Sequence, residues 1–337
     1  MQNIFQKCYS VSLFKITIFG LLLIPAIASA LTISTANNWA GIFAGQSAAY
    51  AISLSNDQHT AVFLKWRLVA KNRTLAQGQD TIRFAENTSI SSHIVLQTPK
   101  MKSGVMLKAK LIIDAVDTEH PQLKDHVEAK LGIYSTDLSQ FDLLNTDKLN
   151  VQLFDPEGQT GQFLTHLQIP YHAISKQQLL NSTATEGLII VGENIALDQQ
   201  RGLMQGLIEL ASLGQKILLL QPKAGTIPLT ELAVQQNGQA PELLLRHNSV
   251  TNSFAQEYAW DLPSTNNLYG LSLTHHRQAI LLQITPYQTG DWSWLQLNYT
   301  QSQGQLIVSL LPFNKVINDY PIPQLIFRKL LVYAYTQ

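Results

Sequence analysis

The sequence predicts a two-domain protein in which an antiparallel β-sandwich precedes an α/β domain. From about residue 31 to residue 133, apolar and polar residues alternate with the period of two that half-buried strands show, and no helical pattern interrupts them. Residues 186–222 instead read as a strand, a helix and a second strand, which is the pattern of one parallel crossover. A chain of 337 residues is long enough to form two separate cores.

Residues 1–30 have the organisation of a signal peptide. Lys7 and Lys15 give a positive start, residues 16–27 form an apolar core, and Ala28-Ser29-Ala30 matches a small-x-small cleavage site. The apolar core is short for a bilayer span. We therefore expect export to the periplasm or beyond the cell, with a mature chain that begins at Leu31; the alternative is an uncleaved anchor.

Charge and cysteine content exclude several classes of function. The 23 basic and 23 acidic residues balance, and removal of residues 1–30 would leave 21 and 23, a net charge of −2. No basic stretch is long enough to indicate a nucleic-acid partner. The single cysteine, Cys8, lies in the predicted signal peptide, so a mature chain would have neither disulfides, thiolate metal sites nor cysteine nucleophiles.

The predicted sandwich covers residues 31–135. Its expected strands are separated by turn-forming residues at roughly 12-residue spacing. In one of them Phe63 and Leu64 compete to face inward, and Trp66 is expected in the core. The candidate strands are 48–54, 61–69, 81–84, 91–96 and 105–113.

A join at residues 114–147 is expected between the domains, with 136–147 as the linker, and the second domain then runs from 148 to 337. A late hairpin around Ser302-Gln303-Gly304 and a C-terminal packing helix are expected in it. The predicted strands are 149–154, 171–174, 242–245, 258–262, 279–285, 293–299 and 305–311, and the short helices are 161–167, 176–180 and 323–335.

The central unit of this domain has the clearest pattern. Its two strands, 188–191 and 217–221, are continuously apolar, as in a parallel sheet that is covered on both faces. Between them, apolar residues recur at helical spacing, from Leu203 to Ala211. Asp198 is the expected N-cap of the helix, and Gly214 is expected to end it in the left-handed conformation.

Residues 187–222 resemble a class I glutamine amidotransferase-like domain of flavodoxin-like architecture. The order of strand, Gly-acid turn, helix, glycine and second strand is similar to the non-catalytic region of bacterial glycoside hydrolase family 2-type proteins, where an Ig-like sandwich comes first. Residues 38–51, 292–311 and 325–335 resemble the first strands, the late hairpin and the final helix of that arrangement. The resemblance implies an Ig-like domain followed by an amidotransferase-like domain.

The catalytic residues of such an enzyme are missing. A working member of the family has a Cys or Ser on the sharp turn after the third strand, but Gln221-Pro222-Lys223 follows the strand here, and an amide side chain is no nucleophile. Nor does any spacing pair two carboxylates as a glycosidase requires. We therefore expect no catalytic residue.

Cofactor motifs are also missing from the sequence. Among the nine histidines only His275 and His276 are adjacent, and neighbouring residues of a strand point to opposite faces. No HExxH, GxGxxG or GxxxxGK pattern is present. The sequence therefore indicates no metal, no nucleotide and no cofactor.

Four residues are candidates for ligand binding. Glu193 follows a predicted strand at the end where open α/β sheets bind ligands, although a solvated turn acid that caps the next helix is the alternative. Trp260, Trp292 and Trp294 could stack on sugar rings, and period two places the last two on one strand face. The alternative for the tryptophans is packing against the sandwich.

Together these observations predict an exported, non-catalytic protein that binds carbohydrate or a partner protein in envelope polysaccharide metabolism. Two alternatives remain open: a glycan hydrolase with unrecognised carboxylates, and a structural partner in an envelope assembly.

Overall fold

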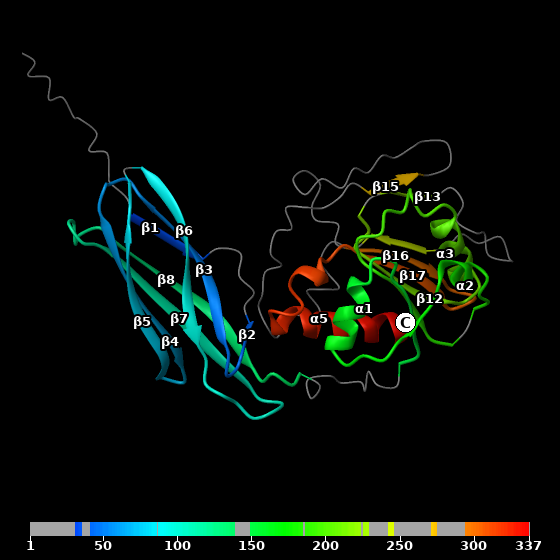
Figure 1. Cartoon of the computed structure of the whole chain (residues 1–337), viewed down its shortest axis with the longest axis horizontal. Coiled ribbons are helices and arrows are strands. Elements are labelled where there is room, and N and C mark those ends of the chain that lie inside the picture. The colour runs from blue at the N-terminus through cyan, green and yellow to red at the C-terminus, as the bar shows by residue number, and fades with distance from the viewer. Residues whose placement is uncertain are drawn as a thin grey trace, which may run out of the picture.

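The computed structural model describes two regions, a β-sandwich and a mixed sheet with helices (Figure 1). The described residues are 31–35, 41–85, 87–138, 149–184, 186–223, 225–228, 242–245, 271–274 and 294–336. The predicted signal peptide at 1–30, most of the predicted linker, and the predicted strands 258–262 and 279–285 lie outside them.

The N-terminal region is a sandwich of two sheets. One sheet has the order β1-β3-β6, and the other has the order β2-β8-β7-β4-β5. All neighbouring strands are antiparallel except β2 and β8. The strands are β1 (Leu31–Thr35), β2 (Gly41–Phe43), β3 (Ser47–Asn56), β4 (Ala61–Ala70), β5 (Arg73–Arg83), β6 (Thr88–Gln97), β7 (Met106–Asp117) and β8 (Lys124–Tyr134).

Alternating burial explains the sandwich, because every second side chain of the facing strands enters one shared core. Leu64 faces inward and Phe63 does not, so Leu64 is the one of the two that enters the core. Trp66 is half-buried and packs against this core, with its indole over Gly78 of β5, where an added Cβ would lie 2.5 Å from Cζ2 of the indole. The prediction of a β-sandwich is thus confirmed.

Residues 114–135 belong to the sandwich, in agreement with its predicted range of 31–135, and not to the join that is also expected to begin at residue 114. Strand β7 continues to Asp117, and β8 pairs with it along its whole length. The inward residues of β8 include Val127, Ala129, Leu131 and Ile133, so the period of two persists through the supposed join. The period of two in the sequence extends to residue 133, but no strand of the sandwich is predicted beyond residue 113.

The C-terminal region contains a seven-stranded sheet in the order β10-β9-β11-β12-β17-β16-β14. The first five of these strands are parallel, and β16 and β14 add antiparallel pairs. Strands β13 (Gly225–Pro228) and β15 (Leu271–Thr274) form a separate parallel pair. The strands of the main sheet are β9 (Val151–Phe154), β10 (His172–Ala173), β11 (Leu188–Val191), β12 (Lys216–Leu220), β14 (Glu242–Leu245), β16 (Trp294–Tyr299) and β17 (Gly304–Ser309).

Helices cover both faces of this sheet, which is why its central strands are apolar throughout. On one face α1 (Gln159–His166) and α5 (Pro321–Thr336) share a core with alternate strand residues such as Ile190 and Leu218. On the other face α2 (Lys176–Leu180) and α3 (Leu203–Ser212) share a second core with the intervening residues, such as Ile189 and Ile217. A short 3-10 helix, η4 (Phe313–Lys315), follows β17.

The central strand–helix–strand unit forms as predicted, with one correction at the helix start. Leu203 and Ala211 are buried, and Gly214 has a φ of 109°. The N-cap of α3 is Gly202, however, and the Asp198 carboxylate accepts a hydrogen bond from the backbone N–H of Gln199 instead. The prediction of Asp198 as N-cap is therefore wrong.

The two regions meet where the N-terminus of α5 packs against β2. An added Cβ on Gly41 would lie 2.6 Å from Cγ1 of Ile322, so only glycine allows this approach. Phe43 and Tyr134 of the sandwich belong to the same apolar cluster as Ile322. Among the described residues, no helix is long and apolar enough to cross a bilayer.

Candidate functional site

The carboxyl ends of the parallel strands form the part of the sheet where a ligand site is expected. In chain order the five parallel strands run 2-1-3-4-5. Strand β9 leads into α1 on one face, and β11 leads towards α3 on the other. The connections therefore diverge between the ends of β9 and β11, which is the switch point at which doubly wound sheets bind ligands.

Asp155 is the first residue after β9, and its carboxylate caps α1. Its Oδ2 accepts the backbone N–H of Gly161 at 2.8 Å. Burial raises the pKa of Asp155, although backbone N–H groups at the start of α1 oppose this effect. The buried Oδ1 has no hydrogen-bond partner in the described structure. The positive end of the helix is thus already occupied by an anion.

Gly192, at the end of β11, leaves the space that Asp155 needs. An added Cβ would lie 2.5 Å from Asp155 Oδ1 and 3.0 Å from Thr160 Oγ1. The Thr160 hydroxyl in turn accepts the backbone N–H of Glu193 at 2.9 Å. The two adjacent strand ends are therefore joined through side chains that only glycine at position 192 accommodates.

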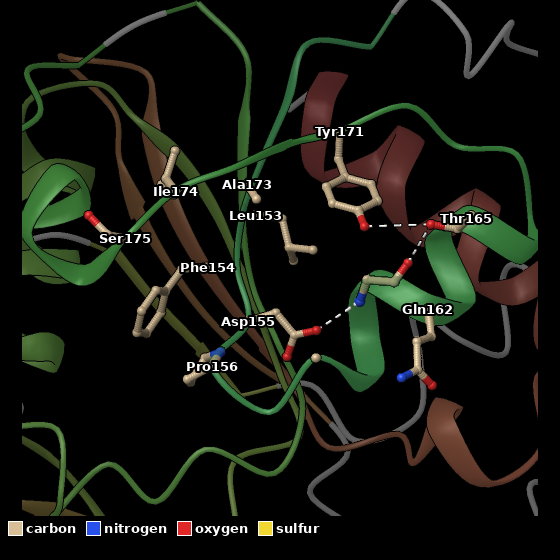
Figure 2. Close-up of a pocket in the computed structure, with 12 residues that line it drawn as sticks. Leu153, Phe154, Asp155, Pro156, Gln162, Thr165, Tyr171, Ala173, Ile174 and Ser175 are labelled. Atoms are coloured by element: carbon tan, nitrogen blue, oxygen red, sulfur yellow. Dashed lines mark hydrogen bonds between the residues drawn. The ribbon is translucent and has the colours of Figure 1, made fainter.

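A pocket of about 570 Å³ opens between the ends of β9 and β10 and the side of α1 (Figure 2). This volume is within the range of small-molecule sites. The ring of Tyr171, which precedes β10, forms one wall, and Asp155 and Pro156 lie at the opposite end. Leu153, Phe154, Ala173 and Ile174 form an apolar floor, and Gln162, Thr165 and Ser175 add polar groups.

A short chain of hydrogen bonds connects the pocket wall to the helix. The Thr165 hydroxyl donates to the carbonyl of Gly161 at 2.8 Å and lies 3.5 Å from the Tyr171 hydroxyl. Gly161 is needed for this arrangement, because an added Cβ would lie 2.9 Å from the Tyr171 hydroxyl oxygen. The phenol is therefore held at its hydroxyl end, while Tyr171 as a whole residue remains 36% exposed.

The charge of the pocket selects against anionic ligands. None of the described residues that line it is Lys, Arg or His, and Asp155 is an acid. A phosphate at the N-terminus of α1 would meet the carboxylate that already accepts the N–H of Gly161. The pocket is suited instead to a neutral ligand with hydroxyl groups and one flat apolar face.

Glu193 lies at the end of β11 as the sequence indicated, but its surroundings differ from both interpretations. The residue is 1% exposed, so it is not a solvated turn acid. Its Oε1 accepts the backbone N–H groups of Phe313, at 2.7 Å, and Asn314, at 3.2 Å, and so holds η4 rather than the next helix. Burial raises its pKa to about 8, against the opposing effect of these donors.

The three tryptophan candidates are not brought together by the described structure. Trp260 and Trp292 lie outside the described residues. Trp294 is the first residue of β16 and pairs with Ser309, but its side chain is outside the description. Their role in stacking stays a prediction, and the pocket described above involves none of them. Among the described residues, no group of His, Cys, Asp or Glu is arranged to hold a metal ion.

Sequence reasoning missed Asp155 and Tyr171. Asp155 carried a usable signal, because it follows the first apolar strand of the domain directly and precedes a helix. Tyr171 carried none, because β10 has only two residues and pairs with β9 at the sheet edge. The strand order places its ring opposite Asp155, and the local sequence pattern does not predict strand order.

Comparisons with known proteins add no functional assignment. No protein-family model matches the chain, and no curated protein matches it significantly. Several solved structures are similar to about a third of it.

The sporulation control protein Spo0M from Bacillus subtilis is 11% identical, with a TM-score of 0.22, over 31% of this chain and 49% of that one. The SafB chaperone–SafA pilin structure from Salmonella enterica is 16% identical, with a TM-score of 0.24, over 32% and 55%. The E. coli chaperone DraB is 11% identical, with a TM-score of 0.24, over 33% and 57%. The chain thus spans about half the length of these structures, and likenesses this weak carry no argument here.

Proposed function

We propose that this is an exported, non-catalytic protein that binds a neutral carbohydrate in the pocket between β9, β10 and α1. The observation that carries the proposal is the exposed ring of Tyr171 facing a pocket that contains an acid and no described cation. A tyrosine ring offers an apolar face for the C–H groups of a sugar, and neighbouring amides and hydroxyls can bind its hydroxyl groups. The setting would be envelope polysaccharide metabolism.

The burial and hydrogen bonding of Asp155 and Glu193 argue against the hydrolase alternative. A glycosidase needs two acids that face a substrate across an open cleft. Asp155 and Glu193 are neighbours, but backbone N–H groups of α1 and η4 bind both, and Glu193 is almost fully buried. No nucleophile follows β12, where Gln221 is also buried. Recognition without turnover therefore fits the pocket better.

Titration calorimetry with a panel of neutral sugars tests the proposal. The panel contains glucose, galactose, N-acetylglucosamine and their β-linked disaccharides. We expect binding to at least one, and Tyr171→Ala should weaken it about tenfold because the stacking surface is lost, whereas Tyr171→Phe should retain most of it. Leu213→Ala, at the exposed apolar residue that directly follows α3, is the matched control and should bind as the parent does. Absence of binding, or equal binding by Tyr171→Ala, would reject the pocket.

A second part of the proposal concerns ancestry. We propose that the C-terminal region is a non-catalytic relative of flavodoxin-like, class I glutamine amidotransferase-like domains, and that the sandwich is Ig-like. The 2-1-3-4-5 order of parallel strands supports the former. Measurable glutamine hydrolysis by the purified protein would contradict the non-catalytic part.

Export is the third part and has its own test. Protein recovered from the cell envelope should begin at Leu31, because Ala28-Ser29-Ala30 follows the apolar segment. N-terminal sequencing checks this expectation. A membrane-embedded product that retains Met1 would show that the segment is an anchor.

A further inference from the structure

The outer face of the five-stranded sheet gathers positive charge that is scattered in the sequence. Inward residues of β4, β7 and β8 enter the core, so the intervening exposed residues share the opposite face. The outward residues of these strands and of β5 include seven cations and two carboxylates, Asp114 and Glu128. The net charge of this face is therefore +5. The cations, here named the basic face, are Lys65, Arg67, Arg83, Lys108, Lys110, Lys124 and Lys130.

The strand register brings like charges next to each other. Lys110 of β7 lies directly opposite Lys130 of β8, and Lys108 is two residues further along the same face. Directly opposed like charges destabilise a sheet. Fold stability therefore does not account for this arrangement.

Most of these cations are available to a partner. Lys110 forms an ion pair with Glu128 at 2.9 Å. Within the described part of the chain, the other six cations form no ion pair. Asp114 instead contacts His126, at 2.7 Å. The positive charge of the basic face is therefore largely uncompensated.

The second outer face of the sandwich shows that such charge is not a requirement of the fold. The outward residues of β1, β3 and β6 include no Lys, Arg, Asp or Glu. Apart from the exposed Val95 they are small or polar, with His93 the one titratable side chain among them. Two sheets of one sandwich thus present a neutral face and a strongly basic face.

The composition of the basic face points to a hydrophilic polyanion. Its outward apolar residues, such as Phe63 and Ile112, are half-buried between the charged side chains. None of the exposed large apolar residues of the described chain lies on it. It therefore lacks the apolar anchors that insert into a membrane and the exposed aromatics that stack on bases.

We propose that the basic face binds an acidic polysaccharide, a polymer whose regularly spaced carboxylates follow the cations across β8, β7, β4 and β5. A small anion would use only one or two of these side chains, whereas an extended chain contacts many of them. The interaction is independent of the neutral-sugar pocket, since no described residue belongs to both.

Binding of polygalacturonate to the purified protein, measured over a salt series, tests this proposal. We expect binding at low salt that weakens steeply as salt rises, because bound counterions are released on complex formation. Lys108→Gln/Lys130→Gln should reduce the affinity about tenfold and lower the slope of log K against log salt by about two. Lys223→Gln/Lys315→Gln, at two exposed lysines of the C-terminal region, removes the same charge and should change neither quantity.

Several outcomes would overturn the proposal. One is absence of binding to polygalacturonate at low salt; another is an equal loss in the control pair, which would indicate a net-charge effect. Binding to phosphatidylglycerol vesicles or to an oligonucleotide, without binding to polygalacturonate, would assign the basic face to a membrane or a nucleic acid. Both Lys108 and Lys130 are exposed, so an unchanged melting temperature verifies that the double variant is folded.

Discussion

Among the described residues, each of the two regions contains one buried carboxylate that joins distant segments, and the net pKa shifts of the two are opposite in direction. Asp117 of the sandwich is 0% exposed, and Glu193 of the C-terminal sheet is 1% exposed. Burial raises the pKa of Asp117, but four hydrogen bonds outweigh it and the net pKa is lowered. For Glu193 burial prevails over two backbone donors, and the pKa rises to about 8.

Glu193 lies deeper in the protein than Asp117, and it also has fewer donors; both differences contribute to the opposite pKa shifts. Asp117 accepts hydrogen bonds from the side chains of Asn56 and Thr60 and from the backbone N–H groups of Glu119 and His120. These donors replace the water that the carboxylate loses. Glu193 has fewer donors, and the nearby Asp155 adds a repulsive negative charge. Two acids that are both shielded from solvent can therefore favour opposite protonation states.

The largest expected effect is the loss of the Asp117 anchor. Asp117→Ala should lower the free energy of unfolding by about 4 kcal/mol, because the buried Asn56 amide and Thr60 hydroxyl lose a charged acceptor. Chemical denaturation measures this. Asp114→Ala, at a half-buried acid of the same strand whose side chain is 44% exposed, is the control and should change stability little. Equal effects of the two substitutions would contradict the account of Asp117.

The pH dependence sharpens the comparison. Because the pKa of Glu193 is raised, its protonated form stabilises the fold at low pH, and this contribution is lost as pH rises from about 4.5 to about 8. The pKa of Asp117 is lowered, so its contribution is present above its unfolded value of about 3.8 and is lost as pH falls. Hydrogen exchange, followed separately in the two regions, should show opposite trends.

Glu193→Gln should remove the loss of fold stability that the parent shows at alkaline pH. At pH 8 the variant should be more stable than the parent by on the order of 3 kcal/mol. This gain is reduced by the free energy of the hydrogen bond that Oε2 accepts from the N–H of Asn314, because the variant lacks that oxygen. At pH 4 the two should be similar. Glu186→Gln, at an exposed acid, should follow the parent throughout. A parallel pH profile for Glu193→Gln and the parent would show that Glu193 is not the titrating group.

A smaller effect is expected at Gly192. Gly192→Ala should cost about 1–2 kcal/mol, since Asp155 and Thr160 must move away from the new methyl group. In an Asp155→Ala background the cost should shrink, which a double-mutant cycle would reveal. Additive costs would mean that the contact with Asp155 is not the cause.

Local patterns predicted much of the fold. The apolar runs around Leu188 and Leu218 indicated buried parallel strands, and the helix 176–180 has the bounds that the sequence indicated. Predictions failed where tertiary context decides. Gly202, rather than Asp198, is the N-cap of α3, and β8 forms in a segment for which no strand is predicted. Neither error involved the central apolar segments.

The candidate site was less predictable, because its contacts join distant residues. Glu193 binds the backbone of Phe313 across 120 positions of the chain, and nothing in the pattern around either residue indicates this. The basic face does not form a continuous run of basic residues in the sequence, since Lys108, Lys110 and Lys130 come together only through the register of β7 and β8. Sheet order and register are therefore the information that the local sequence pattern lacks.

Tyr171→Ala should have the smallest effect on stability, below about 1 kcal/mol, because the residue is 36% exposed and belongs to none of the apolar cores. A melting curve measures this. A large destabilisation would show that the ring supports the fold rather than a ligand.

The most direct test of the central claim is to locate a bound neutral sugar by hydrogen–deuterium exchange. With the tightest ligand of the panel, the account predicts protection of the amides around Asp155–Thr165 and Tyr171–Ser175. It predicts no added protection at Phe313 and Asn314, which Glu193 already binds. Protection confined to the segment around Trp292 and Trp294, or to the basic face, would contradict the assignment of this pocket as the sugar site.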